Sequence, residues 1–243
     1  MAKNNMESLS DDFGIQIAAF AMESKRSLEW VPECDSSNTV AEGMATTGWR
    51  GCVLTDVQHR GRGRLQRRWD SEPGQNLLLS WVKDWHCPLN ATPRLTLLLA
   101  AEIAHELDLW VKWPNDIMTR TGLKVGGILS TIHEVGTDKH TVIIGVGLNV
   151  NQVEFPPELK ASSLRLIHGN EQSRLEILKR LLNAMDRIDP CLDLERWSER
   201  SITLGKRVEV AGRVGVATGI REDGALIVDG VPITSGDVSL VEM

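Results

Sequence analysis

The spacing of apolar residues predicts four helices along the chain. Apolar side chains recur at helical intervals from Phe13 to Leu28, and a second helical stretch begins at Ser37. Pro93 to Leu109 predicts a third helix, because proline suits the first helical turn and leucines then recur on one face. A fourth helix is expected from Leu175 to Ile188, where Pro190 stops it.

Short apolar runs between these helices predict strands. The first run leads directly into an arginine-rich segment, and Pro114 ends another. The turn signal at Gly136–Lys139 predicts a hairpin between the two strands that flank it. The expected strands are Gly51–Val57, Asn76–Val82, Trp110–Trp113, Lys124–Glu134 and Thr141–Val146.

The tail of the chain changes character from about Leu204. Short alternating segments are separated by turn signals such as Glu222–Gly224 and Asp229–Gly230. This pattern predicts a small all-β, barrel-like module of roughly forty residues, which is too small to stand alone and is expected to pack on the larger domain. The segments are Lys206–Val210, Val214–Gly219, Ala225–Val228 and Val238–Val241.

Composition narrows the class of protein. The 243 residues carry a net charge of -6, and 42% hydrophobic with 25% charged residues is ordinary for a soluble globular protein. An acidic balance argues against binding of duplex DNA over a broad surface. The polar N-terminus lacks the apolar core of a secretory signal, and the longest apolar run, Leu97 to Ala101, is far too short to span a bilayer. Because the cysteines form no CxxC pair, a zinc site or redox dithiol has little support, and a cytoplasmic protein with reduced cysteines is expected.

One segment of this acidic chain is strongly basic, with arginines interrupted by two glycines. Glycine lets a backbone come close to a ligand, and arginine binds carboxylate or phosphate oxygens through its forked donors. Gln66 stands where a dinucleotide fingerprint needs its third glycine, and no GxxxxGK[ST] sequence occurs, so neither nucleotide motif fits. We interpret the segment as an anion site; a solvated arginine-rich turn is less favoured, because a buried strand leads into it. The segment contains Arg60, Gly61, Arg62, Gly63, Arg64, Arg67 and Arg68.

Three further motifs place polar or glycine residues at the ends of predicted strands. In Lys112–Asp116 the carboxylate of Asp116 is suited to magnesium or to orienting a basic side chain, although in isolation an ordinary turn is favoured. In Lys124–Leu129 two glycines indicate close approach of the backbone to another group; a ligand and a packing kink are equally favoured. In Gly145–Asn151 asparagines follow a buried strand, which alone favours a polar strand end.

Small polar residues also gather around the start of the second helix. Asp35–Asn38 and Gln58 carry hydroxyl and amide groups suited to a neutral polar head such as a urea. Helix capping by Ser36 or Ser37 is expected whatever else these serines do.

The order and spacing of these motifs resemble the catalytic and C-terminal domains of the biotin protein ligase family, also called biotin–[acetyl-CoA-carboxylase] ligases. The resemblance extends from about Val31 to Met243. Two positions depart from the family pattern: Gln66 replaces the usual glycine, which affects the shape of the loop, and Ser37 replaces a threonine but keeps the hydroxyl. The motifs that carry the resemblance are DSSN at 35–38, QHRGRGRLQRRW at 58–69, KWPND at 112–116, KVGGIL at 124–129 and GVGLNV at 145–150.

The resemblance implies an α+β fold. A mixed central sheet flanked by helices, as in the catalytic domain of class II synthetases, is expected before a small C-terminal SH3-like β-barrel. The implied division is an N-terminal extension at 1–30, a catalytic biotin- and ATP-binding domain at 31–202 and the β domain at 203–243. Regulatory members carry an N-terminal DNA-binding domain. Because only about thirty residues precede the first motif, the monofunctional form is expected.

The resemblance also implies a two-step reaction. The biotin carboxylate attacks the α-phosphate of MgATP, which gives biotinyl-5′-AMP and pyrophosphate. A specific lysine of a biotin carboxyl carrier protein, a subunit or domain of acetyl-CoA carboxylase, then takes the biotin and releases AMP. ATP and biotin as substrates and Mg²⁺ as cofactor are therefore expected. DNA and membranes are not expected partners, and a monomer or homodimer is expected.

Residue roles are implied by matching the family motifs position by position. The implied catalytic residues are Lys124, which bridges the carboxylate and α-phosphate oxygens, Arg64, and Asp116, which assists the incoming lysine or the metal. Other ligands of the metal are not assigned. Trp69 stacks on adenine in this scheme, and a core tryptophan is equally favoured. The implied biotin-binding residues are Ser36, Ser37, Asn38, Gln58, Arg62, Gly63, Arg64, Lys124, Gly126 and Gly127, and the implied nucleotide-binding residues are Arg62, Arg64, Arg67, Trp69, Lys124 and Asn149.

Three other interpretations stay open. A lipoate or octanoate ligase or transferase has a related fold and also modifies a carrier lysine, but the polar cluster of Asp35–Asn38 and Gln58 favours a ureido head. A non-catalytic biotin sensor is opposed by the retained Lys124 and arginines, and a DNA-binding repressor by the short N-terminus and the acidic charge. We also expect the segment 58–70, with its like charges, to be mobile when empty and to order around an anionic ligand.

Overall fold

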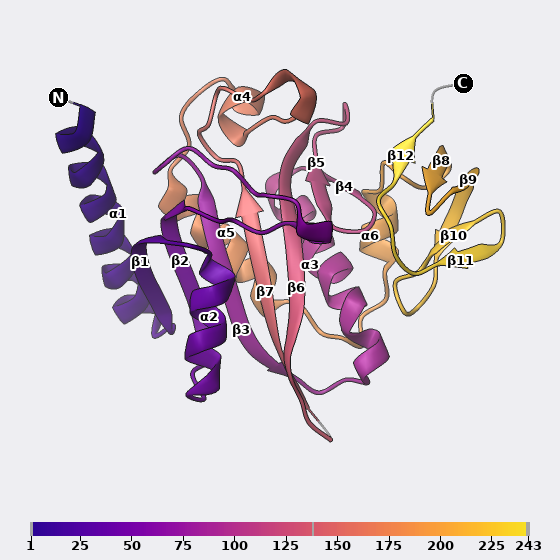
Figure 1. Ribbon diagram of the computed structural model, residues 1–243, viewed down its shortest axis with the longest axis horizontal. Helices are drawn as coiled ribbons and strands as arrows, with labels where there is room; N and C mark the ends of the chain where they lie inside the picture. Colours follow the sequence, from indigo (N-terminus) through magenta and orange to yellow (C-terminus); the bar gives the residue numbers. More distant parts are fainter. Residues whose placement is uncertain (1, 138, 242–243) are drawn as a thin grey trace.

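A seven-stranded mixed sheet forms the centre of the protein (Figure 1), whose computed structural model describes residues 2–137 and 139–241. The strand order is β1-β2-β3-β7-β6-β5-β4. Strands β1 and β2 run parallel, and the other neighbours in this sheet are antiparallel. The strands are β1 (Leu28–Cys34), β2 (Gly51–Gln58), β3 (Leu77–Trp85), β4 (Trp110–Lys112), β5 (Asp116–Met118), β6 (Lys124–Val135) and β7 (His140–Leu148).

Helices cover both faces of this sheet. Figure 1 shows α2 in front of the central strands, α3 and α5 behind them, and α1 beside β1. Within residues 2–137 and 139–241, no helix combines the length and the apolar character that crossing a membrane requires. The helices are α1 (Ala2–Ser24), α2 (Ser37–Thr46), α3 (Thr92–Leu107), α4 (Leu164–His168), α5 (Arg174–Asp186) and α6 (Glu195–Glu199).

Alternation of side chains along the strands separates two apolar clusters. In β2, Val53 packs under α2, whereas Cys52 and Leu54 join the larger core that includes residues of α3 and α5. Val82 of β3 and Ile143 of β7 complete the small cluster under α2. Side chains two residues apart share a face of a strand. Every second position of β3 counted from Val82, and of β7 counted from Ile143, therefore also lies on the α2 face. That part of the sheet carries the site described below.

A second, antiparallel sheet is formed by the C-terminal part of the chain, with the order β11-β10-β9-β8-β12. It is tied to the larger sheet at Trp113, which is buried. The Trp113 indole Nε1 donates to the Gly224 carbonyl at 2.9 Å, and its backbone N–H donates to Thr203 Oγ1 at 3.1 Å. The predicted mixed sheet and second small β unit are confirmed, while the domain boundaries stay predictions. The strands are β8 (Arg207–Val210), β9 (Arg213–Ile220), β10 (Leu226–Val228), β11 (Val231–Ile233) and β12 (Ser239–Leu240).

The structure corrects the predicted elements at the N-terminal edge. The helix expected from Phe13 to Leu28 is wrong at its end, because α1 stops at Ser24 and Leu28 begins β1. Within the sheet β1 pairs with β2 alone, and such an edge strand tolerates Pro32. Its apolar side chains are only partly buried, so the strand pattern is weak. Strands β5 and β11 are also absent from the predicted elements.

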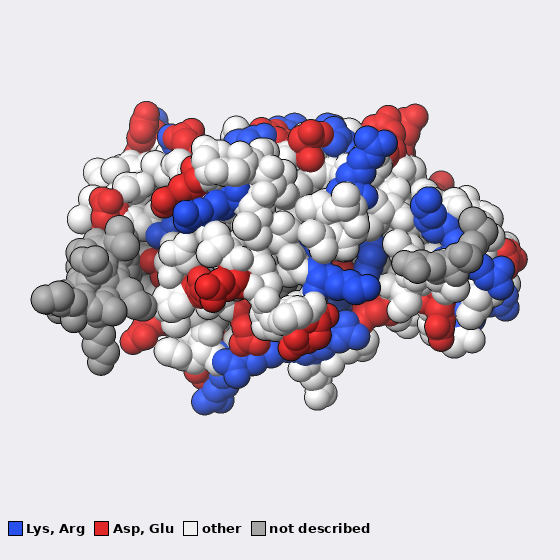
Figure 2. All heavy atoms as spheres, turned by 90° about the horizontal axis from the view of Figure 1, so that it is seen from above, with Lys and Arg blue, Asp and Glu red and all other residues white. Residues whose placement is uncertain are grey.

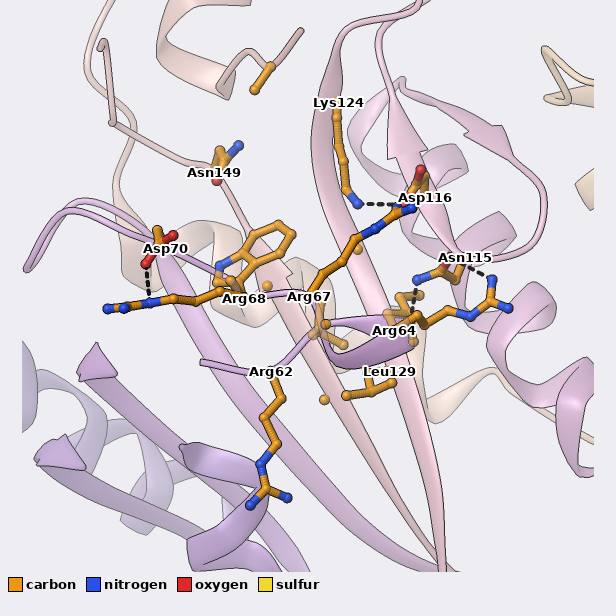
Figure 3. Close-up of a pocket in the computed structure, with 18 of the residues that line it drawn as sticks. Arg62, Arg64, Arg67, Arg68, Asp70, Asn115, Asp116, Lys124, Leu129 and Asn149 are labelled. Atoms are coloured by element: carbon orange, nitrogen blue, oxygen red, sulfur yellow. Dashed lines mark hydrogen bonds and ion pairs between the residues drawn. The ribbon is translucent and has the colours of Figure 1, made fainter. Parts of the chain in front are cut away.

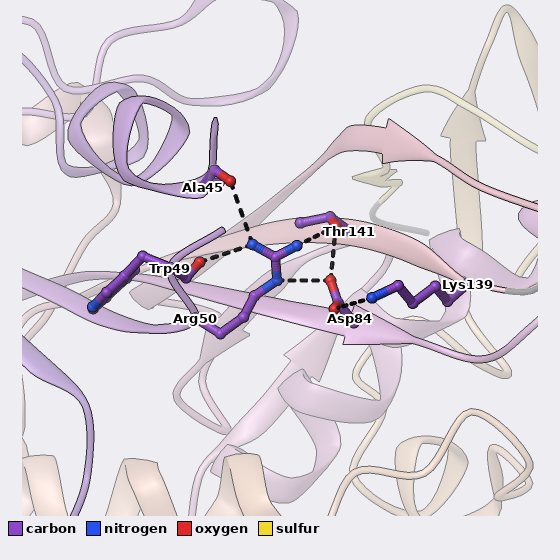
Figure 4. A network of polar contacts seen from close by, with 6 residues as sticks. All are labelled: Ala45, Trp49, Arg50, Asp84, Lys139 and Thr141. Atoms are coloured by element: carbon purple, nitrogen blue, oxygen red, sulfur yellow. Dashed lines mark hydrogen bonds and ion pairs between the residues drawn. The ribbon is translucent and has the colours of Figure 1, made fainter. Parts of the chain in front are cut away.

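A polar network fastens the end of the sheet that lies away from the arginine-rich segment (Figure 4). Arg50 Nε donates to Asp84 Oδ1 at 2.7 Å, Arg50 Nη2 donates to Thr141 Oγ1 at 2.9 Å, and Lys139 Nζ donates to Asp84 Oδ2 at 2.8 Å. Partial burial alone would raise the pKa of Asp84. The hydrogen bonds from Lys139, Thr141 and Arg50 outweigh it and hold the pKa of that carboxyl well below its ordinary value. The network therefore joins β2, β3 and β7 through charge.

Candidate active site

The predicted motifs meet in one cavity of about 470 Å³ on the α2 face of the sheet. One wall is formed by residues 58–70, which we call the arginine loop, and another includes residues 155 and 158–161. Figure 3 shows Lys124 and Arg67 extending toward Asp116, whereas Arg68 extends toward Asp70. Of the predicted site residues, all but Gly126 line this cavity: Ser36, Ser37, Asn38, Gln58, Arg62, Gly63, Arg64, Arg67, Trp69, Asp116, Lys124, Gly127 and Asn149.

The floor of the cavity is a patch of sheet without side chains. Gly127 of β6 and Gly147 of β7 are cross-strand partners on the α2 face. Trp69 lies on this pair: a Cβ atom added to Gly147 would lie 2.5 Å from the indole Cε2, and one added to Gly127 would lie 3.3 Å from Cζ3. Glycine at these positions lets a planar group rest against the backbone. The Trp69 indole Nε1 is buried and has no hydrogen-bond partner among the described residues.

A buried hydrogen-bond network forms one corner of the cavity. Gln58 Oε1 accepts from the backbone N–H of Ser37 at 2.8 Å and from Ser37 Oγ at 3.1 Å. Ser80 of β3 is fully buried; its Oγ lies 2.8 Å from Ser37 Oγ and is hydrogen-bonded to Asn38 Oδ1. Because these groups are buried and hold one another, their donors and acceptors have fixed positions. The corner therefore suits a small, neutral polar group.

Ser36 does not act as the sequence predicts. It occupies the N-cap position of α2, but its side chain makes no capping hydrogen bond. The side chain of Gln58 instead binds the first backbone N–H of the helix, at Ser37. The predicted N-cap position of Ser36 is therefore confirmed, but the expected capping hydrogen bond is not made, and this buried serine lines the cavity.

Two lysines share the carboxylate of Asp116. Lys124 Nζ lies 2.6 Å from Asp116 Oδ1, and Lys112 Nζ lies 3.6 Å from Asp116 Oδ2. Pairing of β4 with β5 sets Lys112 opposite Asp116, and pairing of β5 with β6 sets Asp116 opposite Gly127. The side chain of Asp116 is only 15% exposed, so solvent screens these charges weakly. The trio has a net positive charge, which favours an anion in the cavity.

The arginine loop is closed by its own backbone. The Gly63 N–H donates to the Arg67 carbonyl at 2.7 Å, and the Trp69 N–H donates to the Gly61 carbonyl at 2.9 Å. A side chain at Gly61 would collide with the Trp69 carbonyl. Gln66 has a φ of 60°, in the left-handed region that favours glycine. Gln66, the departure from the family pattern, thus takes the conformation that glycine adopts most easily, at a cost of about 1 kcal/mol.

Counter-ions surround the arginines of this loop. Arg64 Nη1 donates to Asn115 Oδ1 at 3.3 Å and lies 3.6 Å from Asp237 Oδ1. Arg67 Nη2 lies 2.6 Å from Asp237 Oδ2. Arg62 points away from this group in Figure 3. Figure 2 shows basic side chains in the middle of the face seen from above, with acidic side chains close to them. An anionic ligand would therefore replace these carboxylates as the partner of the arginines.

One predicted residue is already engaged in a hydrogen bond, and another is placed differently from the expectation. Asn149 lines the cavity and is buried, but its Nδ2 already donates to the Ser162 carbonyl at 3.0 Å. Gly126 faces away from the cavity, since a Cβ atom there would meet the Gly147 carbonyl oxygen and the side chains of Leu148 and Ile117. Successive residues of a strand point to opposite faces. Only one of the two neighbouring glycines can face the ligand, so the expectation for Gly126 is wrong.

Four residues of the site are missing from the sequence prediction. Ser80 is a polar residue inside the apolar run 77–82, and that position was a usable signal. Lys112 and Asn115 belong to the KWPND motif, in which only the aspartate was singled out. Asp237 has no local signal, because its partners lie more than a hundred residues away in the chain. In residues 2–137 and 139–241 no group of three or more His, Cys, Asp or Glu side chains is arranged to hold a metal ion.

The chain is similar to several known proteins. A model of the Biotin/lipoate A/B protein ligase family matches residues 31–149. The biotin--[acetyl-CoA-carboxylase] ligase of Mycobacterium tuberculosis is 30% identical over 242 residues, which cover 88% of each chain. The bifunctional ligase/repressor BirA of Bacillus spizizenii is 39% identical over 140 residues, or 54% of this chain and 43% of BirA. This chain thus matches less than half of the length of that relative.

Solved structures share the fold. The biotin protein ligase of Aquifex aeolicus in complex with biotin and ATP superposes with a TM-score of 0.67 at 28% identity, covering 89% of this chain and 99% of that one. The apo structure of the Aquifex ligase gives a TM-score of 0.68 at 24% identity, which supports the fold alone. From the mycobacterial relative and the match over the motif-bearing region, the chain belongs to the biotin/lipoate A/B protein ligase family.

Proposed function

We propose that this protein is a biotin protein ligase, which activates biotin with ATP and transfers it to a lysine of a carrier protein. The observation that carries the proposal is that a fixed, neutral polar corner and a cluster of basic side chains line the same cavity. Biotin has a neutral ureido ring at one end and a carboxylate at the other, so it matches both. The names of the mycobacterial relative and of the Aquifex complex support this choice.

The neutral corner receives the ureido ring. Ser36, Ser37, Asn38 and Gln58 supply hydroxyl and amide groups there, and Ser80 holds two of them in place. A site built to hydrogen-bond a polar head rejects a ligand without one, because buried polar groups are then left unpaired. This corner therefore favours biotin over a plain acyl chain.

The basic cluster brings two anions together in the first step. A carboxylate oxygen of biotin attacks the α-phosphorus of ATP, so that an O–P bond forms and the bond from the α-phosphorus to the bridging oxygen breaks. Pyrophosphate leaves. Lys124 and Arg64 compensate the charge where the anions meet, and Arg67 faces the leaving phosphates. Arg62 lines the cavity but points away from them in Figure 3, so it joins them only by turning toward the bound anions. Fixed charges in a cavity shielded from water stabilise such a transition state more strongly than exposed ones do.

The nucleotide lies over the glycine floor in this scheme. Gly127 and Gly147 let the Trp69 indole lie against the sheet, and the ring of Trp69 stacks on the adenine. The amide of Asn149 lines the same part of the cavity and binds the nucleotide.

We expect Mg²⁺ to accompany ATP. Mg²⁺ is commonly bound by substrate phosphates, waters and one or two carboxylates. Asp116 is a cavity carboxylate suited to this once Lys124 turns toward the phosphate. When bound, the metal neutralises charge on the phosphate oxygens.

The second step transfers biotin to a lysine of a biotin carboxyl carrier protein. The neutral amine attacks the carbonyl carbon of the adenylate, a C–N bond forms, and the C–O bond to AMP breaks. The amine loses a proton as the bond forms. Asp116 is placed beside the reacting end of the cavity, where its carboxylate orients the amine and takes this proton.

Biotin-dependent exchange of label between pyrophosphate and ATP tests the proposal. We expect exchange with biotin and none with lipoate or octanoate offered in parallel. Exchange with the acyl chains alone would move the assignment to the lipoate branch of the family. No exchange with any of them, in a sample whose circular dichroism shows a folded protein, would contradict adenylation and favour a non-catalytic sensor.

A further inference from the structure

Asp237 contacts two arginines of the arginine loop at once. Its Oδ2 lies 2.6 Å from Arg67 Nη2, and its Oδ1 lies 3.6 Å from Arg64 Nη1. The carboxylate lines the cavity, and its side chain is 29% exposed. Arg64 also donates to Asn115, so one guanidinium joins the loop, the β4–β5 connection and the C-terminal segment. Asp237 therefore occupies the position that an anionic ligand of these two arginines would take.

The two sides of this contact are not held equally. Asp237 lies between β11 and β12, and its neighbour Val238 is buried in the core. On the other side, Gly236 has a φ of 129° and packs against Val210, with 3.1 Å between its ideal Cβ position and Val210 Cγ2. Arg67, in contrast, is 67% exposed, while Arg64 is 23% exposed and also donates to Asn115. The carboxylate is thus the fixed partner, and Arg67 is the side chain most free to change partners.

We propose that Asp237 is a positioning residue: an internal counter-ion that holds Arg64 and Arg67 in the empty protein and gives them up to the phosphates of the nucleotide. This inference rests on the proposed function, since it takes a nucleoside triphosphate as the incoming anion. A carboxylate fixed beside the arginines cancels part of their charge and competes with phosphate for the same donors. Nucleotide binding therefore releases the contact between the arginine loop and the C-terminal sheet.

The test compares ATP affinity, measured by calorimetry, in the wild type and in Asp237→Asn. We expect the variant to bind ATP about fivefold more tightly, as suits the loss of one partly screened charge pair. Asp237→Glu keeps the charge and should restore the wild-type affinity. Glu222→Gln removes one negative charge from an exposed position of the same C-terminal region and should leave the affinity unchanged. In the exchange assay the KM for ATP should fall in Asp237→Asn while kcat stays the same.

A second readout follows the loop itself. Trypsin should cut the empty Asp237→Asn variant within residues 60–68 faster than the wild type, and ATP should slow cleavage in both. Asp237→Ser gives the same comparison if the asparagine variant does not fold. Affinity equal to or weaker than that of the wild type in the charge-removing variants would overturn the inference. Tighter ATP binding by Asp237→Asn together with no biotin-dependent exchange in the wild type would refute the proposed function and leave the role of Asp237 supported.

Discussion

The floor of the cavity and the arginine loop above it are held by opposite kinds of interaction. The floor is made of β3, β6 and β7, whose backbones are paired along their length and whose polar corner is buried. The arginine loop crosses above this floor and is held by ion pairs such as Arg67–Asp237 and Arg68–Asp70, whose arginines are largely exposed. Exposed ion pairs contribute little stability, about 0–1 kcal/mol each. The floor can therefore define the shape of a neutral head group, while the loop responds to the charge of what is bound.

The largest effect is expected at Lys124, which lies between the floor and the arginine loop. Lys124→Ala should slow biotinyl-adenylate formation about 10²–10³-fold, the usual scale for losing one charge-stabilising group. Lys179→Ala, on the exposed side of α5, is the matched control and should leave the rate unchanged. Single-turnover formation of the adenylate measures both. Adenylation at the wild-type rate in Lys124→Ala would remove this lysine from its assigned role.

The flatness of the floor is tested by Gly147→Ala. The new methyl group would lie 2.5 Å from the indole of Trp69, which must then move off the glycine pair. Overpacking of this kind costs about 2 kcal/mol, or roughly a 30-fold loss of ATP affinity. Gly43→Ala in α2 is the control, because no atom lies within 4 Å of its Cβ position. Unchanged ATP binding in Gly147→Ala, measured by calorimetry, would mean that the nucleotide does not use this floor.

The neutral corner is tested separately by Ser80→Ala. Removal of this buried hydroxyl leaves Asn38 Oδ1 without its donor and removes one of the two hydrogen bonds of Ser37 Oγ, which keeps its bond to Gln58. We expect biotin affinity to fall about tenfold, or roughly 1.4 kcal/mol, and ATP affinity to stay the same. Ser198→Ala on the exposed helix α6 serves as the control. Equal losses for biotin and ATP would show that the change disturbs the whole cavity rather than the corner.

The smallest effect on activity is expected from Asp84, at the other end of the sheet. Asp84→Asn should lower the free energy of unfolding by about 1–2 kcal/mol at pH 7, since charged hydrogen bonds from Arg50 and Lys139 are lost, and should leave exchange activity intact. Folding lowers the pKa of this carboxyl, so its stabilisation is complete above its ordinary value of about 3.9 and fades as the pH falls toward the folded-state pKa.

Thermal unfolding as a function of pH checks this behaviour. The difference in Tm between wild type and Asp84→Asn should be about 2–8 °C at pH 7 and should shrink below pH 3.9. Glu176→Gln, in the exposed pair with Lys179, should change Tm very little. A difference in Tm that grows on acidification would contradict the low pKa of Asp84.

The difference between the floor and the arginine loop also explains which site residues the sequence could predict. Motifs at strand ends, such as Lys124–Leu129 and Gly145–Asn151, were assigned to a common site only through the family resemblance, and residues from both line one cavity. Each motif alone does not predict the site, but once it is placed on a strand the strand fixes the direction of its side chains. For the same reason the alternation of faces should have excluded Gly126, which points into the core.

Other features depend on partners far along the chain, and no local pattern reveals them. Strand β1 is an edge strand with Pro32 and partly buried apolar residues, so its period resembles the end of a helix. Asp237 can be recognised as part of the site only from its contacts with Arg64 and Arg67, which the fold of the C-terminal segment brings about. Ser80 is visible as a polar residue in an apolar strand, but its partners come from α2. Such tertiary contacts can be identified only from the structure.

Amide hydrogen exchange, followed with and without biotin plus ATP, tests most directly whether the arginine loop is ordered by ligands while the floor of the cavity is fixed. The amides of residues 61–70 in the arginine loop should exchange rapidly in the empty protein and slowly with both ligands, because phosphate then replaces the carboxylates beside the arginines. The amides of β3, β6 and β7 beneath the cavity should be slow in both states. A loop that is equally protected with and without ligands, or a floor whose protection changes instead, would contradict the division between a fixed floor and a ligand-ordered loop.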